Sequence, residues 1–549
     1  MASAATAATG DEALSWGRNQ YGQLGNGSLN SAGEWVPGSV ALPDGASVTA
    51  VGGGYGFSIA LTSAGAVLAW GQNDVGQLGE DSFTNSTEPV NVELPEGTTV
   101  TAISVGDDHV LALTSTGQVL AWGYNEWGQL GNGTNTESGL PVEVDLPSGT
   151  TVTAIAAGAG HSLALTSTGE VLSWGDNDLG QLGDGTTTQR TTPVEVRLPA
   201  GITVTALAGG DDHSHALTST GEVLSWGYNV RGQLGDGTTT TRTEPVAANL
   251  PSGTTVTGIA AGTGFQSYAL TSTGELLAWG DNTYGQIGDG TNTHRSEPVS
   301  VHLPEGTIIT QVASGDDHAV ALTDTGQVWS WGYNRYGQVG DGTTTNRNEP
   351  VEVRQPEAQP AVAIGVGSYH SLAIAQSPQT TTTLSAEPER AQVGETVTLT
   401  ADVSCTVGTP TGTVTFTAGG EEIGSAALED GTATLVTDAL PEGEHTIVAR
   451  YEGDDSCPAS ESGPVTVTVG AGQPECDFPP YEDGGDGDGD GAPADDGADG
   501  SPGPCRPLAD TGNDTSAIAT VGLGATLLGG LVLLAATRVL RKRAQQRQP

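Results

Sequence analysis

The sequence predicts an all-β protein built around a seven-bladed β-propeller. Glycine is abundant, with 83 residues in 549, whereas Phe, Tyr and Trp make up 5% of the chain and Met occurs once. This composition favours short strands joined by many turns over helices. The third observation is a repeat, because Trp-Gly pairs recur every 52 to 54 residues, with tryptophans at Trp16, Trp70, Trp122, Trp174, Trp226, Trp279 and Trp331.

Each period contains four segments that have the pattern of short strands. In one period, TVTAIAAG (151–158) and HSLALTS (161–167) are β-rich runs, STG is a turn, and EVLSWG (170–175) is a third strand. GQLGDGT then supplies turn residues, and TPVEVRLP (192–199) makes a fourth strand that ends at proline. Four strands in a period of this length are typical of a propeller blade.

The two ends of the repeat region complete each other. An open row of blades would leave two apolar faces in water, so the ring must close. DEALSWG (11–17) lacks the two strands that precede every other Trp-Gly, and AVAIGVGSYHSLAIA (361–375) supplies two such strands with no Trp-Gly strand after them. We therefore expect 361–375 to pair with 11–17 in one shared blade. This pairing would join the two ends of a propeller that extends over residues 11–376.

These residues also carry a family resemblance. The phrase HSLALTSTGEVLSWGDNDLGQLGDGTTTQRTTPVEV resembles the repeat of the regulator of chromosome condensation family, and it recurs over about two thirds of the chain. The resemblance implies a seven-bladed propeller. It leaves the function open, because such propellers include a nuclear nucleotide-exchange factor, ubiquitin-ligase modules and a secreted bacterial β-lactamase inhibitor. No exchange-factor residue can be assigned to a position of this chain.

The charge balance argues against nucleic-acid binding. The chain has 65 Asp and Glu against 17 Lys and Arg, which gives a net charge of −48 at pH 7. Such a polyanion repels nucleic acid and anionic membranes. All four cysteines lie at or beyond Cys405, so the repeat region has no thiol chemistry and no cysteine metal site.

Histidine recurs at one position of the repeat. It stands at His109, His161, His213, His318 and His370, and Phe57 and the pair Phe265 and Gln266 stand at the other two equivalents. A ring of imidazoles could bind a metal near the propeller axis. Alternatively, each histidine fixes the turn of its own repeat by a hydrogen bond. We expect the second arrangement, because a histidine that recurs with the repeat is explained by the structure that the repeats share and requires no separate function.

Three blades place two carboxylates before that histidine, in GDDH at 106–109, 210–213 and 315–318. Such aspartates are turn formers, with calcium binding or catalysis as the alternatives. A catalytic site usually breaks a repeat, and no blade has a polar set that the others lack. The sequence therefore predicts no catalytic residue, no metal and no cofactor.

The positions that do vary are aromatic and arginine residues in loops. The frame N-x-x-G-Q recurs in every blade while the residues within it change. Repeat proteins build binding faces from loops whose constant residues fix the backbone while other positions vary. Tyr, Trp and Arg are also common at interface hot spots. Neutral drift at exposed positions would give the same pattern. The candidates for a binding face are Trp127, Arg231, Tyr284, Arg335 and Tyr336, with Trp35 as a further departure.

A second domain is expected over residues 380–470, where about seven short strands suggest a β-sandwich. TGTVTFTAGGEEIGSAAL and LPEGEHTIVARYEGDDS resemble the bacterial immunoglobulin-like domains of surface proteins, which usually serve as stalks. Cys405 and Cys457 lie near strand ends, and a disulfide between them would stabilise the domain by about 4 kcal/mol. Cys476 and Cys505 are the remaining candidates for disulfides.

Residues 471–507 are rich in Gly, Asp and Pro and are expected to form an acidic linker. DGDGDG (486–491) imitates the start of a calcium loop, but Gly497 stands where a bidentate Glu is required. The linker is followed by LADTG (508–512), by an uncharged span over 517–537 long enough to cross a bilayer, and by a basic tail over 538–549.

This order of pentapeptide, apolar span and basic tail resembles a sortase cell-wall sorting signal. The motif is Leu508, Ala509, Asp510, Thr511 and Gly512. The resemblance implies that Thr511 becomes the acyl donor to peptidoglycan. Ala509 stands in place of the usual proline, and the motif is in this respect similar to the variant that class E sortases of high-GC Gram-positive bacteria read. The alternative is a plain transmembrane anchor. We expect residues 1–10 to be the remnant of a signal peptide.

Together these features predict a cell-wall-anchored, non-enzymatic surface protein whose extracellular propeller head binds a protein or a glycan. The first alternative is an enzyme or an enzyme modulator, such as a hydrolase inhibitor at the wall. Nucleotide exchange on a GTPase is the third, and it conflicts with an extracellular location.

Overall fold

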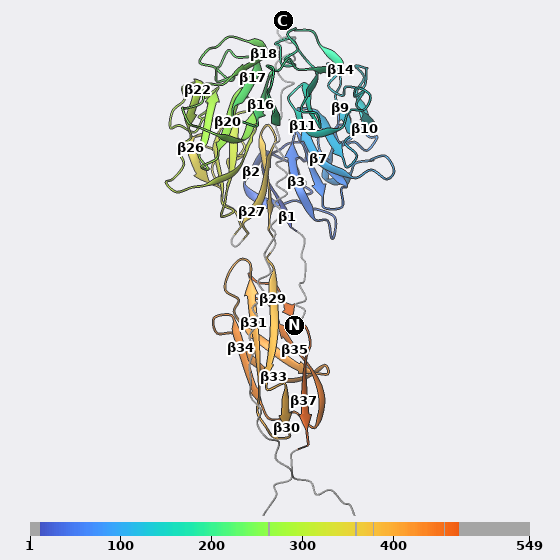
Figure 1. The fold of residues 1–549 in the computed structure, drawn as a ribbon, viewed down its shortest axis with the longest axis vertical. Helices are drawn as coiled ribbons and strands as arrows, with labels where there is room; N and C mark the ends of the chain where they lie inside the picture. The colour runs from blue at the N-terminus through green and yellow to red at the C-terminus, as the bar shows by residue number, and fades with distance from the viewer. Residues whose placement is uncertain (1–10, 262–263, 357–358, 377, 455, 472–549) are drawn as a thin grey trace, which may run out of the picture.

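The computed structural model describes residues 11–471 except 262–263, 357–358, 377 and 455. In this part of the chain every regular element is a strand, from β1 to β37. The strands form a propeller and a sandwich, drawn one above the other in Figure 1. The prediction of an all-β, seven-bladed propeller followed by an immunoglobulin-like sandwich is confirmed.

Six blades are four-stranded antiparallel sheets made from consecutive segments. Their strands are β3 (Val48–Gly53), β4 (Phe57–Thr62), β5 (Val67–Gly71), β6 (Ser86–Asn91); β7 (Val100–Val105), β8 (His109–Thr114), β9 (Val119–Gly123), β10 (Ser138–Glu143); β11 (Val152–Ala157), β12 (His161–Thr166), β13 (Val171–Gly175), β14 (Arg190–Glu195); β15 (Val204–Gly209), β16 (His213–Thr218), β17 (Val223–Gly227), β18 (Arg242–Ala247); β19 (Val256–Ala261), β20 (Gln266–Thr271), β21 (Leu276–Gly280), β22 (Arg295–Ser300); and β23 (Ile309–Ser314), β24 (His318–Thr323), β25 (Val328–Gly332), β26 (Arg347–Glu352).

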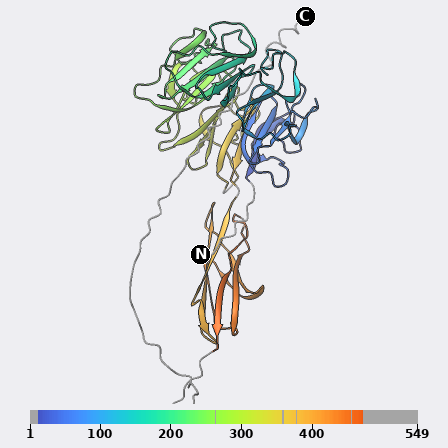
Figure 2. The ribbon, with the colours of Figure 1, turned by 45° about the vertical axis from the view of Figure 1, so that its right-hand side comes forward.

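The seventh blade is shared between the two ends of the propeller, as the sequence predicts. It consists of β1 (Glu12–Asn19), β2 (Asn30–Ser39), β27 (Ala361–Val366) and β28 (His370–Ala375), in the order β2-β1-β28-β27. β1 pairs with β28 from Glu12 opposite Ala375 to Gly17 opposite His370. In Figures 1 and 2 the blue strands of the N-terminal end accordingly lie beside the gold strands of the C-terminal end.

The repeated Trp-Gly and Gly-Gln residues hold neighbouring blades together. All seven Trp-Gly tryptophans are fully buried. In one example Trp174 Nε1 donates to the carbonyl oxygen of Gln129 in the preceding blade, at 2.9 Å. Gly175 has φ +102°, and a Cβ there would lie 2.6 Å from the Gly160 carbonyl oxygen, so only glycine fits after the tryptophan. Side chains from two adjacent blades then form each apolar cluster of the propeller, as Leu111 and Trp174 do.

Two sheets face each other in the sandwich. One has the order β29-β31-β34 and the other β30-β37-β35-β32-β33, with β36 paired to β35. The strands are β29 (Thr380–Glu387), β30 (Arg390–Gln392), β31 (Val397–Cys405), β32 (Thr413–Ala418), β33 (Glu421–Ala427), β34 (Thr432–Thr437), β35 (Gly443–Tyr451), β36 (Ser460–Glu461) and β37 (Val465–Gly470). Alternate residues of β31 point into one core with Phe416 and Tyr451. Cys405 and Cys457 form a disulfide, with their Cα atoms 6.0 Å apart.

The proposed linker, the sorting motif from Leu508 to Gly512, the apolar span 517–537 and the cysteines Cys476 and Cys505 lie outside the described residues. Within the residues that are described, the chain has no helix of the length and apolar character needed to cross a membrane.

Candidate binding face

One end of the propeller carries two loops from every blade. Strand direction alternates within a blade, so the loop between the first and second strands and the loop between the third and fourth strands lie at the same end. We call this end the tip face, and the loops between third and fourth strands the tip loops. An example of a tip loop is 176–189, between β13 and β14. The variable residues of the N-x-x-G-Q frame all lie in tip loops.

The frame residues fix the backbone of each tip loop. In the blade β11–β14, Asn177 Oδ1 accepts from the N–H of Leu182 and Gln181 Oε1 accepts from the N–H of Leu179, both at 3.0 Å. The glutamine bond recurs in all seven blades. The residues whose N–H it holds are Tyr21, Val75, Trp127, Leu179, Arg231, Tyr284 and Tyr336. The same hydrogen bond therefore recurs in every blade while the side chain beside it varies, with Tyr in three blades and Val, Trp, Leu and Arg in one blade each.

Three of the five candidate residues come together. Tyr284 and Tyr336 both contact Tyr333, with ring centroids 4.8 and 6.5 Å apart. The guanidinium carbon of Arg335 lies 5.9 Å from the ring centroid of Tyr336. Tyr333 follows a Trp-Gly pair and directly precedes the N-x-x-G-Q frame. It lies outside the variable positions of that frame, so the sequence pattern alone did not single it out.

The other two candidates have different neighbours. Trp127 contacts Tyr124 edge-on, with 5.3 Å between ring centroids. Arg231 Nε lies 3.5 Å from a carboxylate oxygen of Asp281 in the next blade. Trp35, the further departure, lies in β2 and is 46% exposed.

Around Tyr336 the structure assembles a larger group that sequence analysis missed. We call it the tyrosine cluster, and it consists of Arg18, Tyr21, Tyr55, Tyr333, Tyr336 and Tyr369. The guanidinium carbon of Arg18 lies 5.4 to 5.6 Å from four ring centroids, those of Tyr21, Tyr55, Tyr336 and Tyr369. These distances are within the range of cation–π attraction. The cluster therefore joins the shared blade to the blades on both sides of it.

Hydrogen bonds and burial fix the cluster in place. Arg18 is 8% exposed, and its Nη1 donates to the Tyr55 hydroxyl at 3.3 Å. The Tyr369 hydroxyl donates to a carboxylate oxygen of Asp316 at 2.6 Å. Burial, together with the charge of Asp316, raises the pKa of Tyr369 well above the usual tyrosine range, so this hydroxyl stays protonated and remains a donor. Tyr55 and Tyr369 stand in repeat positions where three other blades have aspartate, and this departure is the sequence pattern that could have revealed the cluster.

The recurring histidines connect blades. His161 Nε2 lies 2.8 Å from Ser214 Oγ of the next blade, and Ser214 Oγ donates to the carbonyl oxygen of Gln181 at 2.8 Å. Since the serine proton is used in that bond, His161 must donate from Nε2. The sequence suggested a bond within the histidine's own turn, and the structure corrects this. Burial lowers the pKa of His161 to about 3. The same arrangement recurs at His109, His213, His318 and His370.

One buried histidine departs from the repeat. His215 lies in β16, where the equivalent residue of β12 is Leu163. Its Nδ1 lies 2.8 Å from Ser225 Oγ, and its Nε2 lies 2.8 Å from Ser267 Oγ in the next blade. Burial lowers the pKa of His215 to about 3, so it is neutral and held from both sides. An imidazole so enclosed is a structural group.

The paired aspartates also bond between blades. The second aspartate of each pair accepts from the Gln Nε2 of the preceding blade, at 3.1 to 3.3 Å, in Asp108, Asp212 and Asp317. In the part of the chain that the structure describes, no three His, Cys, Asp or Glu side chains gather in a group that could hold a metal ion.

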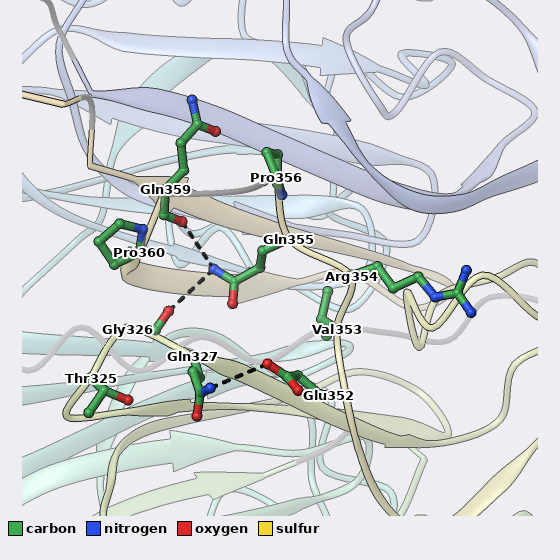
Figure 3. A pocket seen from close by; sticks show the side chains of 10 residues that line it. All are labelled: Thr325, Gly326, Gln327, Glu352, Val353, Arg354, Gln355, Pro356, Gln359 and Pro360. Atoms are coloured by element: carbon green, nitrogen blue, oxygen red, sulfur yellow. Dashed lines mark hydrogen bonds between the residues drawn. The ribbon is translucent and has the colours of Figure 1, made fainter. Parts of the chain in front are cut away.

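A hollow of about 630 Å³ opens at the opposite end of the propeller, between the turn at Gly326 and residues 352–356 and 359–360. Figure 3 shows that the amides of Gln327 and Gln355 are already engaged by groups that line the hollow. The Gln355 amide donates to the carbonyl oxygens of Gly326 and Gln359, and Gln327 donates to Glu352. The tip face, with its variable and aromatic side chains, is the stronger candidate for recognition.

Comparisons with known proteins agree with this architecture. A model of the RCC1-like domain matches residues 143–420, and regulator of chromosome condensation (RCC1) repeats match 11–61, 64–113 and 116–165. A model of the bacterial Ig-like domain (group 3) matches residues 384–470.

Individual relatives share the propeller. The chain is 32% identical over 330 residues to the ultraviolet-B receptor UVR8 of Arabidopsis thaliana, covering 60% of this chain and 75% of the receptor. It is 34% identical to the human E3 ubiquitin-protein ligase HERC2 over 68% of this chain, but this match spans only 8% of the ligase.

A solved structure of yeast RCC1 (Prp20) bound to Kap60 is similar with a TM-score of 0.60 and 25% identity, covering 67% of this chain and 90% of that one. The repeats, the seven blades and these similarities together show that the chain belongs to the RCC1-like propeller family.

Proposed function

We propose that the propeller is a recognition head that binds a protein partner through its tip face. Membership of the RCC1-like family supports the coarser part of this proposal, a protein-binding or regulatory propeller. The observation that carries the proposal is the tip-loop frame, in which one glutamine bond per blade holds the equivalent backbone N–H, while the side chain there is Tyr in three blades and Val, Trp, Leu or Arg in the other four. A repeat that conserves the backbone and varies the side chain is suited to specific binding.

The side chains of the tip face fit protein recognition. Tyrosine offers a large contact area with few rotatable bonds, so little conformational entropy is lost when it binds. Tyr284 is 36% exposed, and Tyr336 beside it is partly exposed on a backbone that Gln338 holds. Arginine and tyrosine are enriched among residues that dominate interface energies. The relatives named above include a receptor and an RCC1 propeller solved in complex with a protein, which is consistent with this role.

We assign the histidines no catalytic role. General acid or base catalysis needs a group whose pKa lies near the working pH and which reaches the substrate. The six histidines of the propeller core are fully buried. For His161, burial lowers the pKa to about 3, which keeps the ring neutral near pH 7. A binding function therefore accounts for the described residues better than an enzymatic one.

We further propose that the head is displayed on a bacterial cell surface. The match of residues 384–470 to a bacterial Ig-like domain supports this, because such a domain can serve as a stalk. The disulfide between Cys405 and Cys457 supports an oxidising location outside the cytoplasm. The sequence order of Leu508 to Gly512, apolar span and basic tail supports covalent attachment to peptidoglycan through Thr511 by a class E type sortase.

Affinity capture with matched variants tests the binding proposal. The immobilised full chain is incubated with a secreted and cell-wall protein fraction, and bound proteins are identified by mass spectrometry. We expect Tyr284→Ala combined with Tyr336→Ala to abolish capture of a saturable protein partner. Ile308→Ala is the control, since Ile308 is 47% exposed and lies between β22 and β23 at the other end of the propeller. Equal capture by both variants, or capture of glycans only, contradicts the proposal.

Cell fractionation tests the display proposal. Wild-type protein is expected in the peptidoglycan fraction, from which only muramidase digestion releases it. Thr511→Ala removes the proposed acyl donor, and the chain is then expected in the detergent-soluble membrane fraction. Recovery of both proteins in the cytoplasm contradicts surface display.

A further inference from the structure

The tip face has opposite charges on its two sides. The first variable residue of the N-x-x-G-Q frame is exposed in all seven blades. In chain order these residues are Gln20, Asp74, Glu126, Asp178, Val230, Thr283 and Arg335. Three consecutive blades thus present a carboxylate, the next two present neutral residues, and the blade before the shared blade presents a guanidinium. The positive position adjoins the tyrosine cluster.

Most other arginines of the propeller are already paired with carboxylates. Four arginines bond the aspartate of their own tip loop at 2.5 to 2.8 Å, and these are Arg190, Arg242, Arg295 and Arg347. Arg197 pairs with Glu244, and Arg231 lies beside Asp281. These charges are largely neutralised within the protein.

Arg18 and Arg335 differ from those residues. Among the described residues, no carboxylate oxygen lies within 4.0 Å of either guanidinium. Arg18 is buried against four tyrosine rings, so its position is fixed and its Nε has no hydrogen-bond partner. Arg335 is exposed and lies over Tyr336. Two positive charges, one fixed below the surface and one accessible above it, therefore flank Tyr336.

The carboxylates nearest to the cluster are already engaged. Asp316 accepts from the Tyr369 hydroxyl at 2.6 Å, and Asp317 accepts from Gln286 Nε2 at 3.1 Å. Asp316 is 5% exposed, so it presents little surface to a partner. Glu34, half-buried in β2, accepts from Asn30 Nδ2 at 3.1 Å, and the guanidinium of Arg335 supplies an accessible positive charge on this side of the tip face.

We propose that the protein partner binds this side of the tip face through a peptide segment that carries a carboxylate beside a proline or an aromatic residue. The inference rests on the proposed function and names the chemistry of the partner. The carboxylate pairs with Arg335, whose planar guanidinium suits bidentate binding, while the neighbouring apolar side chain stacks on Tyr336 and Tyr284. The carboxylates Asp74, Glu126 and Asp178 repel an acidic segment, which directs it away from their three blades and toward the blade of Arg335.

Selection from a random dodecapeptide library displayed on phage tests the proposal without assuming a sequence. The bait is the immobilised full chain in 150 mM salt. We expect the enriched peptides to contain Asp or Glu next to Pro, Tyr, Phe or Trp. Their synthetic versions should bind Arg335→Glu and Tyr336→Ala at least tenfold more weakly than the wild-type chain.

The control is Arg354→Glu. Arg354 is exposed and also lacks an ion pair among the described residues, but it lies at the hollow on the opposite end of the propeller. Unchanged affinity for this variant shows that net charge alone does not explain the loss.

Two further results would overturn the proposal in distinguishable ways. Basic or uncharged peptides whose binding is lost in Tyr336→Ala would reject the acidic partner and leave tip-face binding intact. Peptides that bind the wild-type chain and Tyr336→Ala equally, or no enrichment at all, would reject both the acidic partner and the proposed function.

Discussion

Trp16 Nε1 donates to the carbonyl oxygen of Gln338 at 2.9 Å, across 322 positions of the chain. The donor lies in the first strand of the protein and the acceptor in the blade before the shared one. No covalent bond closes the propeller, so this contact and the ladder between β1 and β28 hold the ring shut. The stability of the whole ring depends on residues at its two ends.

Trp16→Ala therefore destabilises the propeller strongly. The change removes a fully buried indole and its hydrogen bond, and we expect the free energy of unfolding to fall by about 4 kcal/mol. Urea denaturation followed by circular dichroism measures this loss. Trp35→Ala is the matched control, and because Trp35 is 46% exposed we expect a loss below about 1 kcal/mol. Similar losses in the two variants would contradict a ring closed at Trp16.

The buried histidines make the propeller sensitive to acid. Burial lowers the pKa of His161 to about 3 in the folded state, whereas in the unfolded chain it is about 6.5. Below about pH 6.5 the unfolded state therefore binds more protons than the folded state. The contribution of His161 to stability is complete above that pH and falls by about 1.4 kcal/mol per pH unit toward pH 3.

His161→Gln should reduce this acid sensitivity. The chain already has glutamine at the equivalent position, where Gln266 Nε2 donates to Ser314 Oγ of the next blade at 3.0 Å. We expect the slope of unfolding free energy against pH, measured between pH 4 and 6, to become smaller by about 1.4 kcal/mol per unit. An unchanged slope in His161→Gln would show that this ring is not held neutral.

Arg18 holds the tyrosine cluster together at the junction of three blades. Arg18→Ala removes a desolvated cation from four aromatic rings, and we expect a loss of about 2 kcal/mol in unfolding free energy. The near-ultraviolet circular dichroism of the tyrosines should weaken as well, because their rings lose a fixed neighbour. Arg335→Ala, at the exposed side of Tyr336, should cost less than about 0.5 kcal/mol. Unaltered dichroism in Arg18→Ala would contradict the proposed positioning role.

Reduction should affect the two domains differently. The disulfide between Cys405 and Cys457 closes a loop in the sandwich, so its loss lowers the stability of that domain by about 4 kcal/mol. The propeller contains no cysteine, and its unfolding transition should stay in place. Calorimetry with and without a thiol reductant measures both transitions. A shift of the propeller transition would show that the domains unfold as one unit.

The architecture was predictable from sequence because it depends on features that repeat. The Trp-Gly pairs mark the third strands, and the incomplete repeats at 11–17 and 361–375 reveal the shared blade. The fixed frame with variable tips was also visible, since Asn and Gln recur at constant spacing. The repeat period assigns each residue to a strand and each strand to a blade, and these assignments are enough to predict a closed ring of seven blades.

The tyrosine cluster was not predictable in the same way. Arg18, Tyr55, Tyr336 and Tyr369 come from four separate segments and become neighbours only when the ring closes. Tyr55 and Tyr369 replace aspartates of the GDDH pattern, but a departure within one repeat does not show which residues of other repeats it contacts. The partner of each histidine was missed for a related reason, because Ser214 belongs to the repeat after that of His161. Contacts between repeats depend on blade packing, which the sequence of one repeat does not contain.

Site-specific photo-crosslinking tests whether the tip face is the surface that binds a protein partner. A photoreactive phenylalanine analogue replaces Tyr336 on the tip face or, in a second protein, Ile308 at the opposite end. Both proteins are irradiated with the same wall and secreted protein fraction. Recognition by the tip face predicts a discrete protein adduct from position 336 that is absent from position 308. Adducts at position 308 alone, or the same adducts at both positions, would contradict recognition by the tip face.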